Sequence, residues 1–102
     1  MIVVIFRATI KALDPSYFDM AHRLRELAFS EFGCIALHSV IEGNTEITLS
    51  YWPSEERIRA WHMHPEHVVA QQTGKTKWYE NYSVEIATVE RQYEHSLDRT
   101  IG

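Results

Sequence analysis

The most constraining feature of this 102-residue sequence is the order in which strand signals and helix signals alternate along it. Stretches rich in β-branched residues with period-two alternation are typical of strands. Stretches with apolar residues three or four positions apart are typical of amphipathic helices. The sequence therefore predicts strand, helix, strand, strand, helix and strand, over residues 2–11, 14–32, 34–42, 45–52, 54–73 and about 83–93.

Proline and glycine mark the boundaries between these segments. Asp14 followed by Pro15 is a strong helix start, because aspartate caps a helix and proline suits its first turn. Gly43 and Asn44 predict a tight hairpin turn between two strands. Pro65 predicts a break in the second helix, since the residue before a proline avoids the helical region. We expect the tail after about residue 95 to be frayed.

This order of elements predicts the α+β class and, within it, the ferredoxin-like βαββαβ arrangement, an antiparallel sheet with helices on one face. Residues 1–102 are long enough for one domain and too short for two. No repeat or linker composition divides the chain. We therefore expect a single domain.

The other face of the predicted sheet needs a cover of its own. By strand alternation it carries a mainly apolar set, and large apolar patches usually mark an interface. The set is Val3, Ile5, Ala36, Val40, Trp52, Ala87 and Val89. A second copy packed sheet to sheet would bury it, so we expect a homodimer; an unrelated partner is the alternative. Polar residues expected on that face either pair across the dimer or line a small cavity there: Arg7, Thr9, His38, Thr48 and Ser50.

Composition excludes several classes of function. The formal net charge is −4 and no basic stripe is present, so nucleic acid is not an expected partner. No apolar run approaches the ~20 residues of a membrane span. Cys34 is the only cysteine. We interpret it as a buried structural thiol of a cytoplasmic protein. No glycine-rich nucleotide motif occurs, so no cofactor is expected.

Two stretches in the second half of the chain carry a resemblance to a known family. Residues 51–71 combine a strand ending in tryptophan, a capped helix ending in Ala-Trp and a His-Pro-Glu-His turn. Residues 74–82 continue with Trp-Tyr before the last strand. The chain resembles the antibiotic biosynthesis monooxygenase family over nearly its whole length. The resemblance implies a dimeric α+β barrel with a pocket between helices and sheet.

The same resemblance implies two kinds of chemistry. Characterised members of the family include cofactor-independent oxygenases of polycyclic aromatic substrates and heme-degrading monooxygenases. The heme-degrading branch uses an asparagine on the first strand, a tryptophan in the second helical region and a histidine about ten residues later. Trp61 matches the tryptophan, but residues 3–7 contain no asparagine and the iron-ligand position falls on Gln71. A glutamine is a poor heme ligand, which makes this branch the weaker alternative.

His62, His64 and His67 form a dense imidazole cluster around Pro65. Imidazole binds metals such as zinc, copper and iron, but this spacing does not place the ring set on one helical face, so we expect no metal site. Two interpretations remain: the histidines cap and turn the helix, or they contact a ligand. We take His67 and His64 as candidate catalytic residues.

Aromatic residues are concentrated in the same half of the chain. They either pack the core and the dimer contact, or form the walls of a pocket for a planar ligand. We predict Trp61, Tyr51 and Trp78 as substrate-binding residues. The functional prediction is a cofactor-independent monooxygenase-like protein acting on a small aromatic molecule. The alternatives are a non-enzymatic small-molecule-binding or stress-associated dimer, and a heme-binding or heme-degrading monooxygenase.

Overall fold

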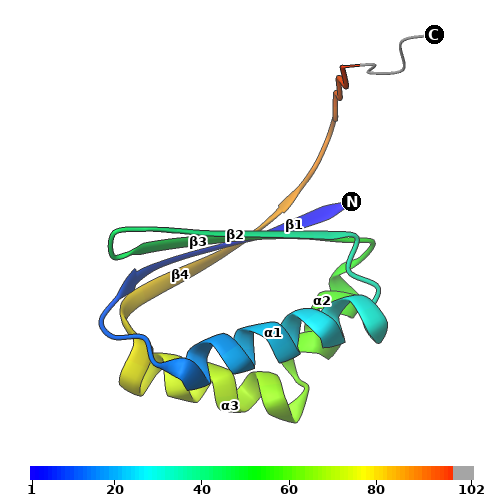
Figure 1. The fold of residues 1–102 in the computed structure, drawn as a ribbon. Helices are drawn as coiled ribbons and strands as arrows, with labels where there is room; N and C mark the ends of the chain where they lie inside the picture. Colours follow the sequence, from blue (N-terminus) through cyan, green and yellow to red (C-terminus); the bar gives the residue numbers. More distant parts are fainter. Residues whose placement is uncertain (98–102) are drawn as a thin grey trace, which may run out of the picture.

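A computed structural model describes residues 1–97 as one antiparallel sheet with all of its helices on one face (Figure 1). The predicted α+β class and ferredoxin-like order are confirmed. No helix within these residues is long and apolar enough to cross a membrane. The elements are β1 Ile2–Ile10, α1 Pro15–Ser30, β2 Ala36–Glu42, β3 Thr45–Trp52, α2 Glu55–His62, α3 Pro65–Thr73, the π-helical turn η1 Gly74–Trp78 and β4 Tyr79–Thr88.

The strand order is β2-β3-β1-β4, with β1 paired antiparallel to both β3 and β4. The β2–β3 hairpin turns at Gly43, whose positive φ of 60° is a conformation that glycine adopts without strain. Beyond Thr88 the chain leaves the sheet, and residues 89–97 run away from it without regular structure (Figure 1). The part of the predicted frayed tail at residues 98–102 lies outside the described residues.

Side-chain caps start the three α-helices where the sequence predicts. The Asp14 carboxylate accepts from the Tyr17 backbone N–H at 3.1 Å, and the Ser54 hydroxyl accepts from that of Arg57 at 3.3 Å. The His64 ring caps α3 by accepting from the Glu66 N–H at 3.1 Å. Each cap contributes about 1 kcal/mol by satisfying a donor that the helix leaves free.

Two clusters of buried side chains hold the helices to the sheet. The larger one lies beneath α2 and is built around Trp52, which is fully buried. Its other buried members are Val4, Leu27, Ala28, Cys34, Ile58 and Trp61. The smaller cluster joins Tyr17 of α1, Ala70 of α3 and Trp78. The space between the two clusters is where the candidate site lies.

The last strand differs from the prediction at both ends. We expected it over about residues 83–93, whereas β4 begins at Tyr79 and ends at Thr88. The earlier start follows from η1, because Gly74 does not stop the helix but lies in helical conformation, with φ −57° and ψ −46°. The wider π-helical turn then delivers Trp78 into the core and leads directly into the strand.

The strand register also corrects the predicted faces of β3. Ile2 pairs with Trp52, and Phe6 pairs with Thr48, so these residues share a face. Since Trp52 is buried in the cluster under α2, that face is the one the helices cover. Trp52, Thr48 and Ser50 were expected on the outer face, and that expectation is wrong. The outer face of β3 instead carries Ile47, Leu49 and Tyr51, opposite Arg7, Ile5 and Val3 of β1.

Candidate functional site

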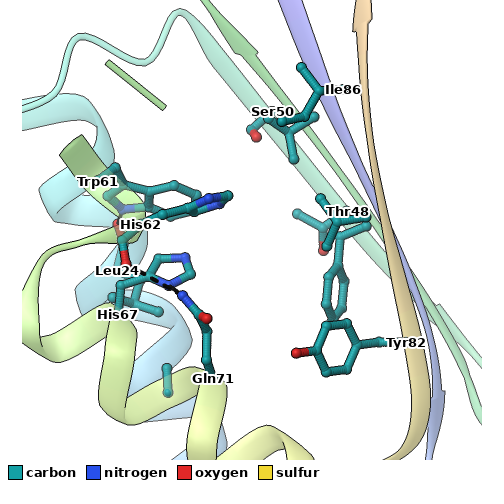
Figure 2. Close-up of a pocket in the computed structure, with 13 residues that line it drawn as sticks. Leu24, Thr48, Ser50, Trp61, His62, His67, Gln71, Tyr82 and Ile86 are labelled. Atoms are coloured by element: carbon teal, nitrogen blue, oxygen red, sulfur yellow. Dashed lines mark hydrogen bonds between the residues drawn. The ribbon is translucent and has the colours of Figure 1, made fainter. Parts of the chain in front are cut away.

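A cavity of about 460 Å³ separates the helices from the sheet between the two buried clusters. Figure 2 shows its two walls facing each other, with Trp61, His62, His67 and Gln71 on the helix side. The full helix wall is Leu24, Trp61, His62, His67, Ala70 and Gln71. The sheet wall is Val4, Phe6, Thr48, Ser50, Tyr82, Val84 and Ile86. Most of this lining is apolar, as in typical small-molecule sites.

Trp61, a residue of α2, forms one end of the cavity. Contacts with three other residues hold its ring in place. Its indole Nε1 donates to the backbone carbonyl of Leu24 at 3.1 Å, which ties α2 to α1. Its ring lies 5.0 Å from the ring of Trp52 and 4.4 Å from that of His67, in the second case edge to face. Because the indole N–H is already used, Trp61 offers a ligand an aromatic surface and no hydrogen bond.

Two imidazoles lie beside this tryptophan on the helix wall. The break at Pro65 brings His62, at the end of α2, next to His67 in α3, with ring centres 4.8 Å apart. Burial, and to a smaller extent the neighbouring His62, lowers the pKa of His67 to about 4. Burial also lowers the pKa of His62. Burial therefore favours the neutral form of both rings, so the wall is polar but not cationic.

Gln71 lies one helical turn after His67. Its side chain contacts the His67 ring and the His62 backbone. Its amide Nε2 lies 2.9 Å from His67 Nδ1 and 3.4 Å from the backbone carbonyl of His62 (Figure 2). The sequence analysis considered Gln71 only as a failed heme ligand. The structure shows that it fixes the orientation of the His67 ring.

The sheet wall contributes hydroxyl groups among apolar side chains. The Ser50 hydroxyl accepts from Trp52 Nε1 at 2.8 Å, so its own proton remains free to donate elsewhere. Thr48 exchanges a hydrogen bond of 2.7 Å with Ser39. Tyr82 stacks on Phe6 with ring centres 5.5 Å apart and faces Gln71 across the cavity (Figure 2).

The structure brings together only part of the predicted site. Trp61 and His67 line the cavity, and their substrate-binding and catalytic roles stay predictions. His64, the other candidate catalytic residue, does not line the cavity: its ring caps α3 and lies against Phe32. Tyr51 is on the outer face of β3, and Trp78 is buried against Tyr17, so neither forms a cavity wall.

The cavity residues that sequence reasoning missed have three different explanations. Thr48 and Ser50 were assigned to the wrong face of β3, because one register decides the side of every residue in a strand. Tyr82 was expected before the last strand and is instead inside it. The spacing of His67 and Gln71, four residues apart within one helix, was the available signal for their contact.

The cavity residues differ from those that the resemblance implies for the heme-degrading branch. Gln71 stands where that branch has its iron ligand, and β1 presents Val4 and Phe6 to the cavity rather than an asparagine. Within residues 1–97 no group of three or more histidine, cysteine, aspartate or glutamate side chains is placed to hold a metal ion. Cys34 is buried, and burial raises the pKa of its thiol, so it is a poor nucleophile.

A second, more open cavity of about 280 Å³ lies between α1 and the β2–β3 hairpin. It meets the first at Leu24, Thr48 and Trp61. One of its lining residues is Glu46, which is 2% exposed and accepts a hydrogen bond from the Tyr79 hydroxyl at 2.8 Å. Burial raises the pKa of the Glu46 carboxyl, and the hydrogen bond from Tyr79 offsets this in part.

Comparisons with known proteins give one clear relative in sequence and many in structure. No family model matches the chain. It is 39% identical over 90 residues to the uncharacterized protein YqjZ of Bacillus subtilis, covering 87% of this chain and 79% of that protein.

The structural relatives share the fold at low sequence identity. SnoaB, a cofactor-independent oxygenase from Streptomyces nogalater, superposes with a TM-score of 0.75 at 10% identity, covering 92% of this chain and 97% of SnoaB. Rv0793 from Mycobacterium tuberculosis gives 0.74 at 11% identity, over 91% and 98% of the two chains. An antibiotic biosynthesis monooxygenase gives 0.64 at 16% identity, over 89% and 100%. At these identities the likeness is one of fold alone.

Proposed function

This chain belongs to the family of YqjZ and has an antibiotic biosynthesis monooxygenase-like ferredoxin fold, and from that premise we propose that it is a cofactor-independent, monooxygenase-like protein acting on a small aromatic molecule. The observation that carries the proposal is the cavity beside His67. It combines apolar walls with imidazole and hydroxyl groups at a few points, which is the pattern of a site for a planar ligand bearing a polar substituent.

The volume and chemistry of the cavity suit this role. About 460 Å³ is within the range of ~300–1,000 Å³ usual for small-molecule sites. A substrate such as a phenol, once deprotonated, can itself give an electron to O₂, so the protein needs to supply only an apolar environment and hydrogen-bonding groups. We place His67, whose ring is in contact with Gln71, against the oxygen atom of the bound phenol.

We further propose that the protein works as a homodimer, formed through the outer face of the sheet. Val40 is 63% exposed on this face, and the partly buried Ile5, Leu49 and Tyr51 lie beside one another across β1 and β3. An apolar sheet face of this kind is costly to leave in water. With its single cysteine buried and unpaired, the protein suits the reducing cytoplasm, where we place it.

The test is His67→Ala, assayed with 1-naphthol under air by tryptophan fluorescence for binding and by O₂ uptake for turnover. We expect affinity to fall about tenfold, the value of one hydrogen bond. The rate should fall about 100-fold or more, as when a single polar catalytic group is removed. His95→Ala is the matched control, because His95 is an exposed histidine beyond β4 that lines neither cavity.

Three outcomes separate the remaining functions. Binding of 1-naphthol without O₂ uptake would favour the non-enzymatic binding dimer. If His67→Ala and His95→Ala bind and turn over 1-naphthol equally, the cavity beside His67 is not the site of the proposed function. A tight heme complex with a shifted Soret band, lost on changing one histidine, would restore the heme alternative against the argument from Gln71.

A further inference from the structure

The orientation of the Gln71 amide decides which nitrogen of His67 carries the proton. The amide Nε2 lies 3.4 Å from the backbone carbonyl oxygen of His62, which can only accept a hydrogen bond. The side of the amide facing that carbonyl is therefore its NH₂ group and not its oxygen. The same NH₂ group lies 2.9 Å from His67 Nδ1, so Nδ1 receives a hydrogen bond.

A neutral imidazole has one donor nitrogen and one acceptor nitrogen. Burial and, to a smaller extent, the neighbouring His62 and His64 lower the pKa of His67 to about 4, against the opposing effect of a hydrogen bond with its own backbone, so the neutral ring is favoured at pH 7. With Nδ1 accepting from Gln71, the proton is on Nε2. Within residues 1–97, the contact with Gln71 is the only side-chain hydrogen bond of the His67 ring, and the residue borders the cavity. The Nε2–H is thus left for a ligand.

The rest of the cavity supports a donor at this point. Among the described residues that line the cavity there is no lysine, arginine, aspartate or glutamate, so none of them brings a full charge to the imidazole. Electrostatic interactions are stronger in such an apolar space than in water. A neutral imidazole N–H in this setting stabilises negative charge that develops on a bound oxygen, and costs no reorganisation because its partner already holds it.

We infer that His67 is a hydrogen-bond donor, oriented by Gln71 as a positioning residue, and that the cavity takes aromatic ligands through an acceptor oxygen, either a ring carbonyl or a phenolate. The inference rests on the proposed function and specifies its ligand class. It also assigns the deprotonation of a phenol to solvent or to another group, because a protonated Nε2 cannot take that proton. Gln71→Glu should move the proton of the neutral His67 ring from Nε2 to Nδ1, because a carboxylate accepts a hydrogen bond from Nδ1–H. Nε2 is then left with a lone pair and can only accept.

The first arm of the test is ¹⁵N NMR of the histidine rings in the unmodified protein at pH 7. We expect the His67 Nδ1 signal in the unprotonated range and Nε2 in the protonated range. The opposite pattern would overturn the inference directly, without any substitution or ligand. Gln71→Glu, measured at pH 8.5 so that the ring stays neutral even after a pKa rise of roughly 1–3 units, should show the reversed pattern.

The second arm measures binding of three ligands with one skeleton: indane, which has no oxygen, 1-indanone, which only accepts, and 4-indanol, which also donates. The unmodified protein should bind 1-indanone about tenfold more tightly than indane, the effect of one hydrogen bond. Gln71→Glu should abolish that tenfold preference at pH 8.5 and retain binding of 4-indanol. An unchanged preference for 1-indanone, in a variant whose ring NMR shows the reversed pattern, would overturn the inference.

The two arms distinguish this inference from the proposed function. If none of the three ligands binds the unmodified protein, the aromatic-ligand function fails and its ligand class fails with it. If indane and 1-indanone bind equally, the aromatic cavity stands and the donor role of His67 is overturned. The NMR pattern of the unmodified protein decides the tautomer in every case.

Discussion

The two faces of the sheet distribute polar and apolar side chains in an unusual way. On β3, the face under the helices carries Glu46, Thr48 and Ser50, whereas the face without a cover carries Ile47 and Leu49. In a sheet with one solvated face the polar residues are expected outside. The polar side chains under the helices line the two cavities. The apolar side chains on the outer face favour the proposed contact with a second copy of the chain.

The energetics of the two faces differ accordingly. Under the helices, polar groups retain hydrogen bonds, as Ser50 does with Trp52 and Glu46 with Tyr79, because an unpaired buried polar group costs about 1–3 kcal/mol. On the outer face the apolar side chains of the same strand need no polar partners, and the proposed dimer would remove them from water. Adjacent residues of one strand therefore serve two different purposes.

The largest expected effect is on the free energy of unfolding. It should differ between alanine substitutions at Trp52 and at Tyr51, which are neighbours on opposite faces of β3. Trp52→Ala should lower the free energy of unfolding by about 3–5 kcal/mol, because Trp52 is 0% exposed at the centre of the main cluster. Tyr51→Ala should lower it much less at concentrations where the protein is monomeric. Urea unfolding with matched m-values measures both. Equal losses for the two variants would mean that Tyr51 is as deeply packed as Trp52 within one chain.

The second prediction concerns assembly through the outer face. Leu49→Lys should weaken the dimer at least 100-fold, which corresponds to about 2.7 kcal/mol, because a charge would be buried among apolar side chains of both copies. Phe18→Lys is the control, since Phe18 is a 57% exposed residue of α1 away from the sheet. Sedimentation across a concentration series measures both. An unmodified protein that sediments as a folded monomer at micromolar concentration would contradict the proposed dimer.

Sequence reasoning was sufficient for the type and order of the main elements and insufficient for the ends of the last strand and for the site. Local signals such as Asp14-Pro15 and the Gly43 turn act within a few residues, and the elements that they delimit are confirmed. The face of Trp52 is a long-range property set by its pairing with Ile2. An alternating strand with a tryptophan on one side and Leu49 on the other is ambiguous, because both sets contain apolar residues.

The site itself depends on contacts between elements, which spacing alone does not determine. His64 and His67 are three residues apart, and the sequence made both of them candidate catalytic residues. The start of α3 separates them: His64 uses its ring to cap the helix, while His67 lies in the first turns and borders the cavity. In our inference, the nitrogen of the His67 ring that carries the proton depends in addition on the hydrogen bond from Gln71 to the backbone carbonyl of His62, which orients the Gln71 amide.

The smallest expected effect is the pH dependence of stability that comes from Glu46, a polar residue on the sheet face under the helices. Its Oε2 accepts from Tyr79 at 2.8 Å, but its Oε1 has no hydrogen-bond partner among the described residues. Burial raises the pKa of this carboxyl above its ordinary value, so the folded state binds the proton more tightly than the unfolded state. The stability contributed by the protonated form is present below the ordinary pKa of 4.5 and is lost as the pH rises through the folded-state pKa.

Glu46→Gln removes this titration while its amide oxygen can still accept from Tyr79. The free energy of unfolding of the unmodified protein, relative to that of Glu46→Gln, should therefore fall by on the order of 1 kcal/mol between pH 4 and pH 7. Glu42→Gln, at an exposed glutamate of β2, provides the control for the loss of one carboxylate. Urea unfolding of the three proteins at several pH values measures the difference. Parallel stability curves for the unmodified protein and Glu46→Gln would show that the carboxyl reaches solvent, and that this side of the sheet is less dry than its burial indicates.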